Sequence, residues 1–506
     1  MTDRLAMRFP RAAGVLLHPT ALPGPHGSGD LGPAAYHFVD WLQGGGQRLW
    51  QVLPLGGIGP GNSPYMSPSA FAGNVLLIDL AELRDRGWLD AGELESHGAF
   101  SDRSVAFEVV VPYRLDRLAR AAKRFEATAT ADERADLAAF TARQVNWLPD
   151  YALFMALDEH FGASEWCDWD APLARRDAAA LQAAKVRHAE RIAFWTFCQW
   201  CFDRQWQRLR AYANARGVRI VGDVPIFIAH QSADVWARPD LFELDAAGRP
   251  IVVAGVPPDL FSATGQRWGN PLYRWSVHAA DGYGWWIERI RHTLARVNLA
   301  RIDHFRGFAG HWEIAAREPT AINGRWVAGP GAALFDAIAA ALGPLPLIAE
   351  DLGVITPDVD ALRKQFGLPG MRVLQFAFGQ GDGPLNRYLP HNHEPDSVTL
   401  TGTHDNDTTV GWWASASEAV RQHVRDYLAT DGSDIAWDLI RAAHASVGDT
   451  AIVPLQDVLA LSSEHRMNVP GEGRGNWGWR FSWADVQPEH ATRLRALTHL
   501  YGRCAD

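Results

Sequence analysis

The stretch ARIDHFRGF, residues 300–308, places charged side chains directly at the end of an apolar run. The preceding VNLA (297–300) is typical of a strand that enters a core, where a charged group is costly unless it is paired or used in chemistry. Arg301 and Asp303 are two residues apart, so on a strand they share a face. This pair alone allows two interpretations: a salt bridge at a strand end, or a reactive carboxylate that a guanidinium keeps ionised.

Other acidic residues follow other apolar runs, namely Asp223, Glu350, Asp351 and Asp405. Carboxylates gathered at one end of a sheet repel one another, so the arrangement is destabilising unless arginines compensate or chemistry requires it. Retaining cleavage of a glycoside needs a carboxylate nucleophile about 5–5.5 Å from a carboxylic acid. A third acid can hold sugar hydroxyls. The pattern therefore predicts a site that cleaves glycosidic bonds.

Aromatic residues in Gly-, Pro- and Ser-rich segments are consistent with a sugar cleft. Of 22 Trp, 22 Phe and 10 Tyr, most will belong to the core. Three lie in segments that we expect to be loops: Tyr65 in GNSPYMSPSAFAGN, Trp268 in PPDLFSATGQRWGNPLY and Trp477 in GEGRGNWGWRF. Their flat faces suit the stacking of pyranose rings.

The elements that position these residues are predicted as strands and helices in alternation. Eight short, β-branched or Leu-rich runs have the continuous apolar character of parallel strands that are buried on both faces. Helical patterns lie between several of them, which predicts an α/β protein with a (β/α)8 barrel. The eight runs are GVLLHP (14–19), RLWQVLP (48–54), VRIVGDVP (218–225), VNLARID (297–303), PLIAED (346–351), MRVLQF (371–376), SVTLTGTHD (397–405) and TAIVPLQD (450–457).

The uneven spacing of these runs predicts two large insertions. A barrel unit takes roughly 30 residues, and the gaps after strands two and three are far longer. We therefore expect insertion subdomains at about 56–215 and 229–295 in a single catalytic barrel that spans residues 1–506, with no separate C-terminal domain. Both follow the carboxyl end of a strand, where they would build a substrate cleft above the barrel.

Composition excludes several classes of partner. The 506 residues are 47% hydrophobic and 21% charged, and the net charge of −10 is spread along the chain. This favours solubility and argues against a nucleic-acid or anionic-membrane partner. The N-terminal apolar run is broken by His18 and Pro19, so we expect neither a secretion signal nor a membrane span there. We therefore expect the protein to be cytoplasmic. We expect a monomer or a weak homo-oligomer.

No metal site is expected. Cys198 and Cys201 form a C-x-x-C inside FWTFCQWCFDRQW, which is predicted to be a continuous helix, so we interpret them as buried core cysteines. His391 and His393 in LPHNHEPD are interpreted as part of a solvated turn before strand seven.

Nearly the whole length of the chain resembles the 4-α-glucanotransferases of the amylomaltase (disproportionating enzyme) family. The resemblance implies that Asp303 is the nucleophile, Glu350 the acid/base and Asp405 the third carboxylate. The substrate-binding residues that it implies are Arg301, His404, Tyr65, Ser63, Asp223, Asp259, Gln266, Trp268, Asn270 and Phe376. The motifs that carry it are LLHPTALPG with SGDLG, SPYMSPSAFAGN, GDVPIFIA, GVPPDLFSATGQRWGNPLY, RIDHFRGF, AEDLG followed by GLPGMRVLQFAF, TGTHDNDT, and RMNVPG with NWGWR.

The activity implied by this resemblance moves an α-1,4-glucan segment through a covalent glycosyl-enzyme to the 4-hydroxyl of an acceptor glucan or glucose. The result would be disproportionation of maltooligosaccharides, with cyclisation left open, and no cofactor is required. Three features depart from the family pattern: Leu260, where relatives often carry Tyr or Phe, the segment GGIGPGN before Ser63, which lacks an aromatic residue that some relatives have, and Glu472, where a smaller residue is expected. The first two bear on the lid, the acceptor side and the preferred product size, and no effect is assigned to Glu472.

Three other classes were weighed against this one. A barrel aldolase or sugar-phosphate enzyme would need a Schiff-base lysine or a metal cluster, and the only lysines, Lys123, Lys185 and Lys364, lie in helical patterns. A glucan-binding protein without activity would not need four acids at strand ends. A plain α-glucan hydrolase differs only in its acceptor and stays open on the residues alone.

Overall fold

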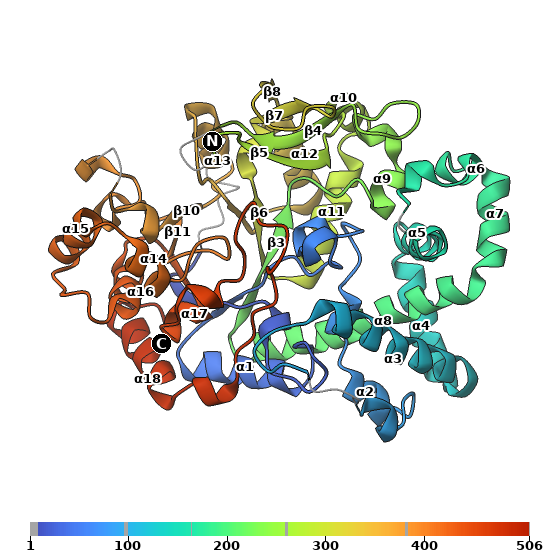
Figure 1. Ribbon diagram of the computed structural model, residues 1–506, viewed down its shortest axis with the longest axis horizontal. Helices are drawn as coiled ribbons and strands as arrows, with labels where there is room; N and C mark the ends of the chain where they lie inside the picture. The colour runs from blue at the N-terminus through green and yellow to red at the C-terminus, as the bar shows by residue number, and fades with distance from the viewer. Residues whose placement is uncertain (1–8, 96–99, 163, 259–261, 380–382, 505–506) are drawn as a thin grey trace.

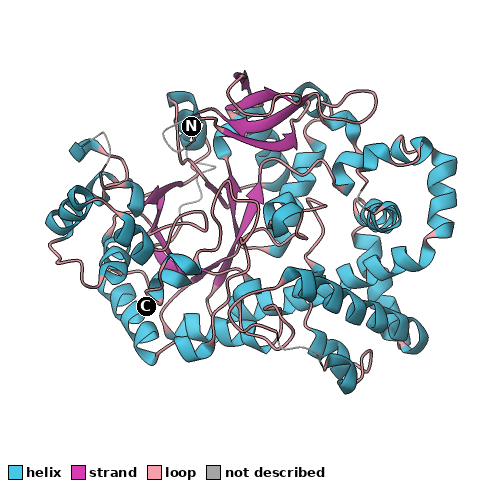
Figure 2. Ribbon diagram, viewed as in Figure 1, coloured by secondary structure: helices cyan, strands magenta, loops and turns pink. Residues whose placement is uncertain are grey.

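A closed ring of parallel strands forms the centre of the protein (Figures 1 and 2). The computed structural model describes residues 9–95, 100–162, 164–258, 262–379 and 383–504. The sheet ends at β9 and β10, where the backbone N–H of Ala349 donates to Pro369 O at 2.9 Å and joins the two edges. The expected barrel is therefore confirmed. Its strands, in order, are β10 (Gly370–Val373), β11 (Ser397–Leu400), β12 (Thr450–Pro454), β1 (Ala12–Leu16), β2 (Leu49–Gln51), β3 (Arg219–Pro225), β6 (Leu299–Asp303) and β9 (Leu347–Ala349).

Each of the eight predicted runs overlaps one barrel strand, but the strands are shorter than predicted, and β1 and β10 begin before their runs. Asp303 is the last residue of β6, and Glu350 directly follows β9. Asp223 was expected after a strand, yet it lies inside β3. Asp405 was expected at a strand end, but β11 already ends at Leu400 and Asp405 belongs to the loop beyond it. The apolar pattern locates each strand but not the residue at which ladder hydrogen bonding stops.

Helices cover the outside of the ring. Helix α1 (Pro33–Gly44) begins with Pro at its first position and buries Ala35, Phe38, Val39 and Leu42, the spacing of one helix face. The other helices around the barrel are α8 (Ala189–Ala215), α11 (Gly284–Arg296), α12 (Ala332–Leu342), α13 (Pro357–Gln365), α14 (Thr409–Ser415), α15 (Glu418–Leu428), α16 (Ile435–Ala445), α17 (Leu455–Val458) and α18 (Pro488–Leu500).

The segment between β2 and β3 forms a helical region beside the barrel, on the right in Figure 1. Its helix α8 packs on α3, α4 and α5 and also contacts α1 and β3, so one helix belongs to both the insertion and the barrel wall. Within α8, Cys198 and Cys201 are buried and unpaired, as expected. The helices before it are α2 (Leu80–Asp85), α3 (Phe107–Thr128), α4 (Ala131–Arg143), α5 (Leu148–Phe161), α6 (Ala171–Ala174) and α7 (Ala178–Arg187).

A second, antiparallel sheet lies at the top of Figure 1 and was not anticipated from the sequence. Its order is β5 (Gln266–Pro271), β4 (Val252–Val256), β7 (Gly310–Ala315) and β8 (Gly324–Ala328). Strands β4 and β5 follow barrel strand β3, with helices α9 (Ala233–Ala237) before them and α10 (Trp275–Ala280) after them, whereas β7 and β8 follow β6. The segment that carries Trp268 was expected to be an irregular loop, but Trp268 lies on β5, because pairing with β4 orders this Gly-rich stretch.

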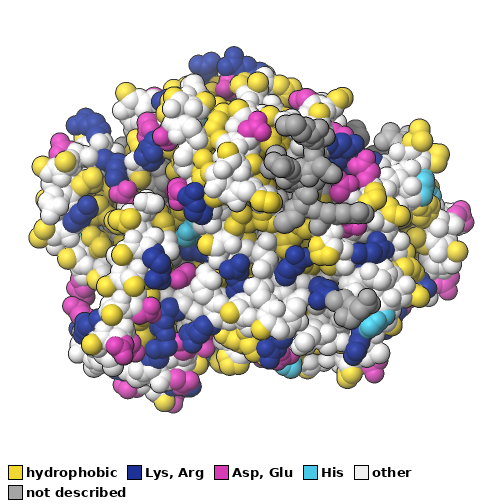
Figure 3. Space-filling model, turned by 180° about the vertical axis from the view of Figure 1, so that it is seen from behind, with side chains coloured by type: hydrophobic (Ala, Val, Ile, Leu, Met, Phe, Trp, Pro, Cys, Tyr) yellow, Lys and Arg dark blue, Asp and Glu magenta, His cyan; other side chains and the backbone are white. Residues whose placement is uncertain are grey.

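The surface on the face shown in Figure 3 carries basic and acidic side chains interspersed, without a broad region of one sign. Within the described residues, none of the helices combines the length and the apolar character that crossing a bilayer requires.

Candidate active site

One arginine links two carboxylates of neighbouring barrel strands. The register pairs Asp223 with Arg301, and Pro225 with Asp303. The buried guanidinium of Arg301 donates through Nη1 to both oxygens of Asp223, at 2.8 and 2.6 Å, and through Nη2 to Asp303 Oδ1 at 2.9 Å. Such charge-assisted bonds favour the ionised form of a carboxylate. Of the two interpretations of R-x-D, the salt bridge is therefore present, and it joins two acids rather than one.

Glu350 lies at the same level as Asp303, because Ile302 and Ala349 are register partners and each acid follows its partner residue directly. Its Oε2 accepts the backbone N–H of His304 at 2.7 Å, and its Oε1 accepts that of Leu352 at 2.7 Å. Burial raises the pKa of Glu350 to about 7, and the charge of Asp303 opposes ionisation further. Near neutral pH this carboxyl group can therefore carry a proton to donate.

The environment of Asp303 differs from that of Glu350. Burial also raises the pKa of Asp303, but the Arg301 guanidinium opposes this shift through a direct contact. Asp303 thus has a guanidinium in direct contact, whereas the carboxyl group of Glu350 accepts from backbone N–H groups. Different environments of two neighbouring carboxyl groups are what assigns one acid and one nucleophile in a glycosidase.

The turn after Asp303 has an unusual backbone conformation. His304 is not glycine, yet it adopts a left-handed conformation with φ 54° and ψ 48°. This conformation costs roughly 1–2 kcal/mol, and the hydrogen bonds of the turn offset it. His304 N donates to the Glu350 side chain, and Phe305 N donates to the Glu350 carbonyl at 3.2 Å. The turn aims two successive N–H groups at one residue.

Asp405 and His404 stand in the loop beyond β11. Asp405 Oδ1 lies 3.2 Å from His404 Nε2 and accepts a hydrogen bond from Asn468 Nδ2 at 2.6 Å. Its carbonyl oxygen accepts from Arg466 Nη2 at 2.9 Å. Arg466 and Asn468 belong to the segment RMNVPG and were not among the predicted site residues. The available signal was the Arg and Asn of that polar segment, but only the fold brings it to Asp405.

Tyr65 connects the cluster of Asp223 and Arg301 with the pair of His404 and Asp405. Its hydroxyl donates to Asp223 Oδ2 at 2.8 Å, since an ionised carboxylate only accepts, and its ring stacks on His404 with centroids 5.0 Å apart. Burial raises the pKa of Tyr65 well above its usual value, so the phenol stays protonated. Ser63 Oγ accepts the Tyr65 N–H at 3.2 Å and so supports the turn that presents this ring. Trp477 completes the cluster, 5.7 Å from the Tyr65 ring.

Trp268 approaches the site from strand β5. Its ring meets the His304 ring edge-on with centroids 4.8 Å apart, and its Nε1 donates to Gln266 Oε1 at 3.1 Å. Asn270 is buried, with Nδ2 3.5 Å from Met66 Sδ. The predicted site residue Asp259, and Leu260 beside it, lie outside the described residues.

Phe376, a predicted binding residue, and Glu472, a departure from the family pattern, make contacts away from the catalytic acids. The Phe376 ring packs edge-on against Tyr388 with centroids 5.5 Å apart. Glu472 stands in an exposed turn, where its carbonyl oxygen accepts from Asn476 Nδ2 at 2.8 Å. Neither contact assigns the residue a task at the centre of the site.

A hollow of about 410 Å³ opens beside His404. Apolar side chains such as Leu17 and Met467 line it together with His18, Thr403 and Asn406. Burial lowers the pKa of His18 to about 3, with His404 as a second cause, so His18 is neutral. Free space therefore lies directly next to the histidine that contacts Asp405.

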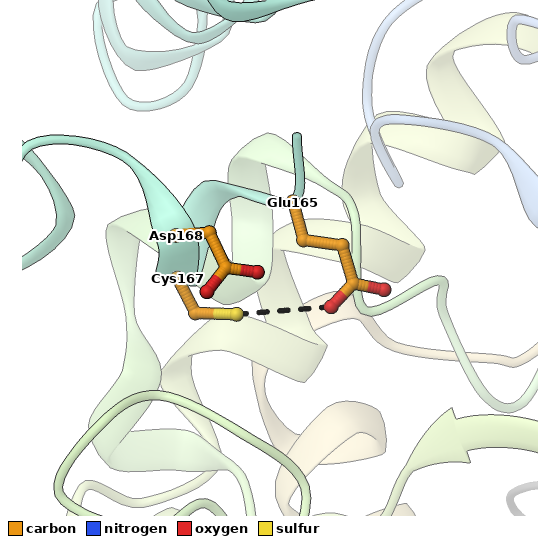
Figure 4. Close-up of side chains that lie close together, drawn as sticks. All are labelled: Glu165, Cys167 and Asp168. Atoms are coloured by element: carbon orange, nitrogen blue, oxygen red, sulfur yellow. Dashed lines mark hydrogen bonds between the residues drawn. The ribbon is translucent and has the colours of Figure 1, made fainter. Parts of the chain in front are cut away.

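Among the described residues, one group of three side chains has ligand atoms close enough together to hold a metal ion. Figure 4 shows Glu165, Cys167 and Asp168, whose ligand atoms lie within 4.8 Å of one another. Arg249 already forms ion pairs with both carboxylates of this group. Both carboxylates therefore already have a positive partner, and we assign no metal there.

The two histidines of LPHNHEPD do not act together. His391 is exposed and its Nδ1 lies 2.8 Å from Tyr427 Oη. His393 was expected to be solvated, but it is buried, with Nδ1 2.7 Å from Ser446 Oγ and Nε2 2.9 Å from Tyr388 O. Its position beside strand β11 and helix α16 explains the difference.

Comparison with known proteins adds three findings. A sequence model described as 4-alpha-glucanotransferase matches residues 17–486. The chain is 51% identical over 499 residues to a 4-alpha-glucanotransferase of Thermus thermophilus, covering 97% of this chain and 99% of that one, and 45% identical over 518 residues to a chloroplastic/amyloplastic 4-alpha-glucanotransferase of Solanum tuberosum, covering 99% and 88%. Among solved structures, the amylomaltase from Streptococcus agalactiae in complex with acarbose superposes with a TM-score of 0.94 at 37% identity, covering 98% of this chain and 100% of that one.

Proposed function

Since the chain belongs to the 4-alpha-glucanotransferase family, we propose that the acids at the mouth of its barrel carry out the transfer of α-1,4-glucan segments that is the activity of this family. The observation that carries the assignment is the difference between the surroundings of Asp303 and Glu350. Asp303 is held against Arg301, whereas Glu350 is buried and has a pKa of about 7. Retaining transfer requires this difference between two neighbouring carboxyl groups.

In the first step, an ionised oxygen of Asp303 attacks the anomeric carbon of the donor glucan. The bond from that carbon to the leaving 4-oxygen breaks, and this oxygen takes the proton of Glu350. The product is a glycosyl ester on Asp303, with Glu350 now ionised. Arg301 keeps Asp303 ionised before the attack and supports the same carboxylate when it leaves.

In the second step, Glu350 removes the proton of an acceptor hydroxyl at carbon 4, and that oxygen attacks the anomeric carbon and displaces Asp303. One α-1,4 bond has been broken and one formed, and Glu350 carries a proton again. Another glucan chain or glucose supplies the hydroxyl.

The remaining polar groups are proposed to bind the sugar at the point of cleavage. Asp405 is half exposed, and His404 and Asn468 both contact its Oδ1. Its other oxygen has no hydrogen bond to the described part of the chain and can accept sugar hydroxyls. The Tyr65 hydroxyl contacts both Asp223 and His404 and so joins the acids of β3 and β6 to the loop of Asp405. As the sugar flattens toward an oxocarbenium ion, negative groups around it stabilise the developing charge.

The experiment that tests the function is a product analysis with maltotriose as the only substrate. Transfer yields glucose together with longer maltodextrins, while the total number of reducing ends stays constant. Hydrolysis raises the number of reducing ends and yields only shorter products. A steady rise in reducing ends that accounts for all maltotriose consumed would overturn the proposal in favour of a hydrolase.

A further inference from the structure

A second hollow is lined by residues of strand β3 and helix α11, two elements that are labelled near the middle of Figure 1. Its empty volume is about 680 Å³, which includes space that is open to solvent. Residues of strand β3 and the segment 54–72 line one side, and α11 lines the other. The layer between a barrel and its helices is normally filled by apolar side chains, so a hollow of this size needs an explanation.

The face of α11 toward this hollow is polar. Arg289, His292, Thr293 and Arg296 follow the spacing i, i+3, i+4, i+7, which places them on one face where a barrel helix normally carries apolar residues. Arg289 has partners, because it donates to the carbonyl oxygens of Ile226 and Pro225 at the end of β3. Its task is to hold that strand end.

Arg296 lacks such partners. Arg296 is only 8% exposed, and its Nε has no hydrogen-bond partner among the described residues. In that part of the chain, the guanidinium packs on the Phe202 ring, with Cζ 5.3 Å from the centroid, and forms no ion pair. Burial lowers the pKa of Arg296 to about 10, so the group remains a cation at neutral pH. Asp203 attracts this cation electrostatically, but no carboxylate among the described residues contacts it, and a buried charge without a contacting counter-ion is destabilising.

No other group in the hollow offsets this charge. Asp223 is the only acid among the described residues that line it, and Arg301 and Tyr65 already occupy its oxygens. His292 Nε2 lies 2.8 Å from Phe71 O, and a carbonyl oxygen only accepts, so Nε2 carries the hydrogen and Nδ1 is an acceptor. The site therefore offers one unpaired cation and one neutral acceptor.

We propose that this hollow binds a phosphate group, with Arg296 as its principal ligand. A planar guanidinium pairs with phosphate oxygens through two parallel hydrogen bonds. His292 Nδ1 can accept from the hydroxyl of a singly protonated phosphate. A neutral sugar would leave the charge of Arg296 uncompensated. The phosphate belongs either to the free inorganic ion or to a hexose phosphate. The hollow shares Asp223 and Tyr65 with the candidate active site, but the proposed ligands Arg296 and His292 are not part of that site.

The test is isothermal titration calorimetry of the full chain in a buffer without phosphate or sulfate. Inorganic phosphate is expected to bind with a dissociation constant of about 1 mM or lower. Arg296→Met should weaken this binding at least about tenfold. Arg291→Met is the matched control, because Arg291 lies on the same helix but is exposed and pairs with Glu288, and its variant should bind within about twofold of the parent.

Two further arms identify the source of the phosphate and control for folding. If glucose 6-phosphate binds more tightly than inorganic phosphate, the ligand is a hexose phosphate. If it binds equally or more weakly, the ligand is the free ion. Glucose alone should not compete with phosphate for the hollow. If Arg296→Met fails to fold, Arg296→Lys retains the charge without the planar fork and should still weaken binding at least about threefold. No binding of phosphate up to about 10 mM, or equal binding in folded Arg296 and Arg291 variants, would overturn the proposal.

Discussion

The backbone N–H of His304 donates to Glu350 Oε2 at 2.7 Å, so the residue after the proposed nucleophile holds the proposed acid/base. The left-handed backbone of His304 then directs the next N–H, that of Phe305, to the carbonyl oxygen of Glu350 at 3.2 Å. The turn therefore couples the positions of two carboxylates that come from different strands. The cost of this backbone conformation is one way in which a site is preorganised.

Asp303→Asn should lower the turnover of maltodextrins at least about 10³-fold, because an amide cannot form the glycosyl ester. Folding should be retained, since Asn keeps the shape of Asp and the bonds from Arg301 to Asp223 persist. The measurement is glucose release from maltotriose together with the affinity for maltodextrin. Near-normal turnover by the folded variant would remove Asp303 from the role of nucleophile.

Glu350→Gln should fail on natural glucans but still react with a maltosyl fluoride, whose leaving group needs little protonation. The glycosyl-enzyme on Asp303 should then accumulate, because no base activates the acceptor. Mass spectrometry of the intact protein would detect the added maltosyl mass. An equal loss of first-step rate on the fluoride and on maltotriose would contradict the assignment.

The same variant should differ from the parent in how stability depends on pH. Burial raises the pKa of Glu350 from 4.5 to about 7, so between these values the folded protein binds more protons than the unfolded chain. The free energy of unfolding of the parent should therefore fall with rising pH, relative to Glu350→Gln, by up to about 3 kcal/mol.

Urea unfolding at about pH 5 and about pH 8 measures this difference, and identical pH dependence in both proteins would contradict it. The activity of the parent should also decline above about pH 7, as the acid that protonates the leaving group ionises.

Trp268→Ala should raise the ratio of hydrolysis to transfer without abolishing cleavage. Water is present at about 55 M and an acceptor glucan at about 1 mM, so parity already requires a preference of about 5 × 10⁴, or about 6 kcal/mol. The Trp268 ring packs on the His304 ring beside the catalytic acids and can both stack on an acceptor sugar and exclude water.

The measurement is reducing-end formation against glucan transfer on maltotriose. Trp326→Ala is the control, because Trp326 lies on β8 at the far edge of the same sheet and is 44% exposed. An unchanged ratio in Trp268→Ala, or the same change in both variants, would speak against a role in excluding water.

Asp351→Asn should destabilise the protein by about 3–5 kcal/mol, the usual effect of removing one partner of a buried ion pair. Asp351 is 1% exposed and accepts from Arg372 at 3.1 Å, Arg387 at 2.6 Å and the Met371 N–H at 2.6 Å. Urea unfolding measures the loss. Asp434→Asn is the control, since Asp434 pairs with Arg493 at the surface, where both side chains are about half exposed, and it should cost less than about 1 kcal/mol. Equal losses in the two variants would show that burial of Asp351 does not decide its contribution.

The barrel was predictable because its signal is local. A strand buried on both faces needs four to seven consecutive apolar residues, and this pattern survives in a single sequence. The second sheet was not predictable in this way. Strand β4 pairs with β5 on one side and with β7, from a different excursion of the chain, on the other. These partners are selected by packing above the barrel and not by local propensity.

The assignment of roles within the site divides in the same manner. The types of the catalytic residues and their order along the chain follow from the sequence, as Arg301 and Asp303 illustrate, because two residues on one strand share a face. The pKa of Glu350, the contact of Asn468 with Asp405 and the link from Tyr65 to Asp223 exist only in the tertiary structure. The physical reason is that burial and hydrogen bonds between distant segments depend on which parts of the chain meet, and the sequence alone specifies residues but not their neighbours.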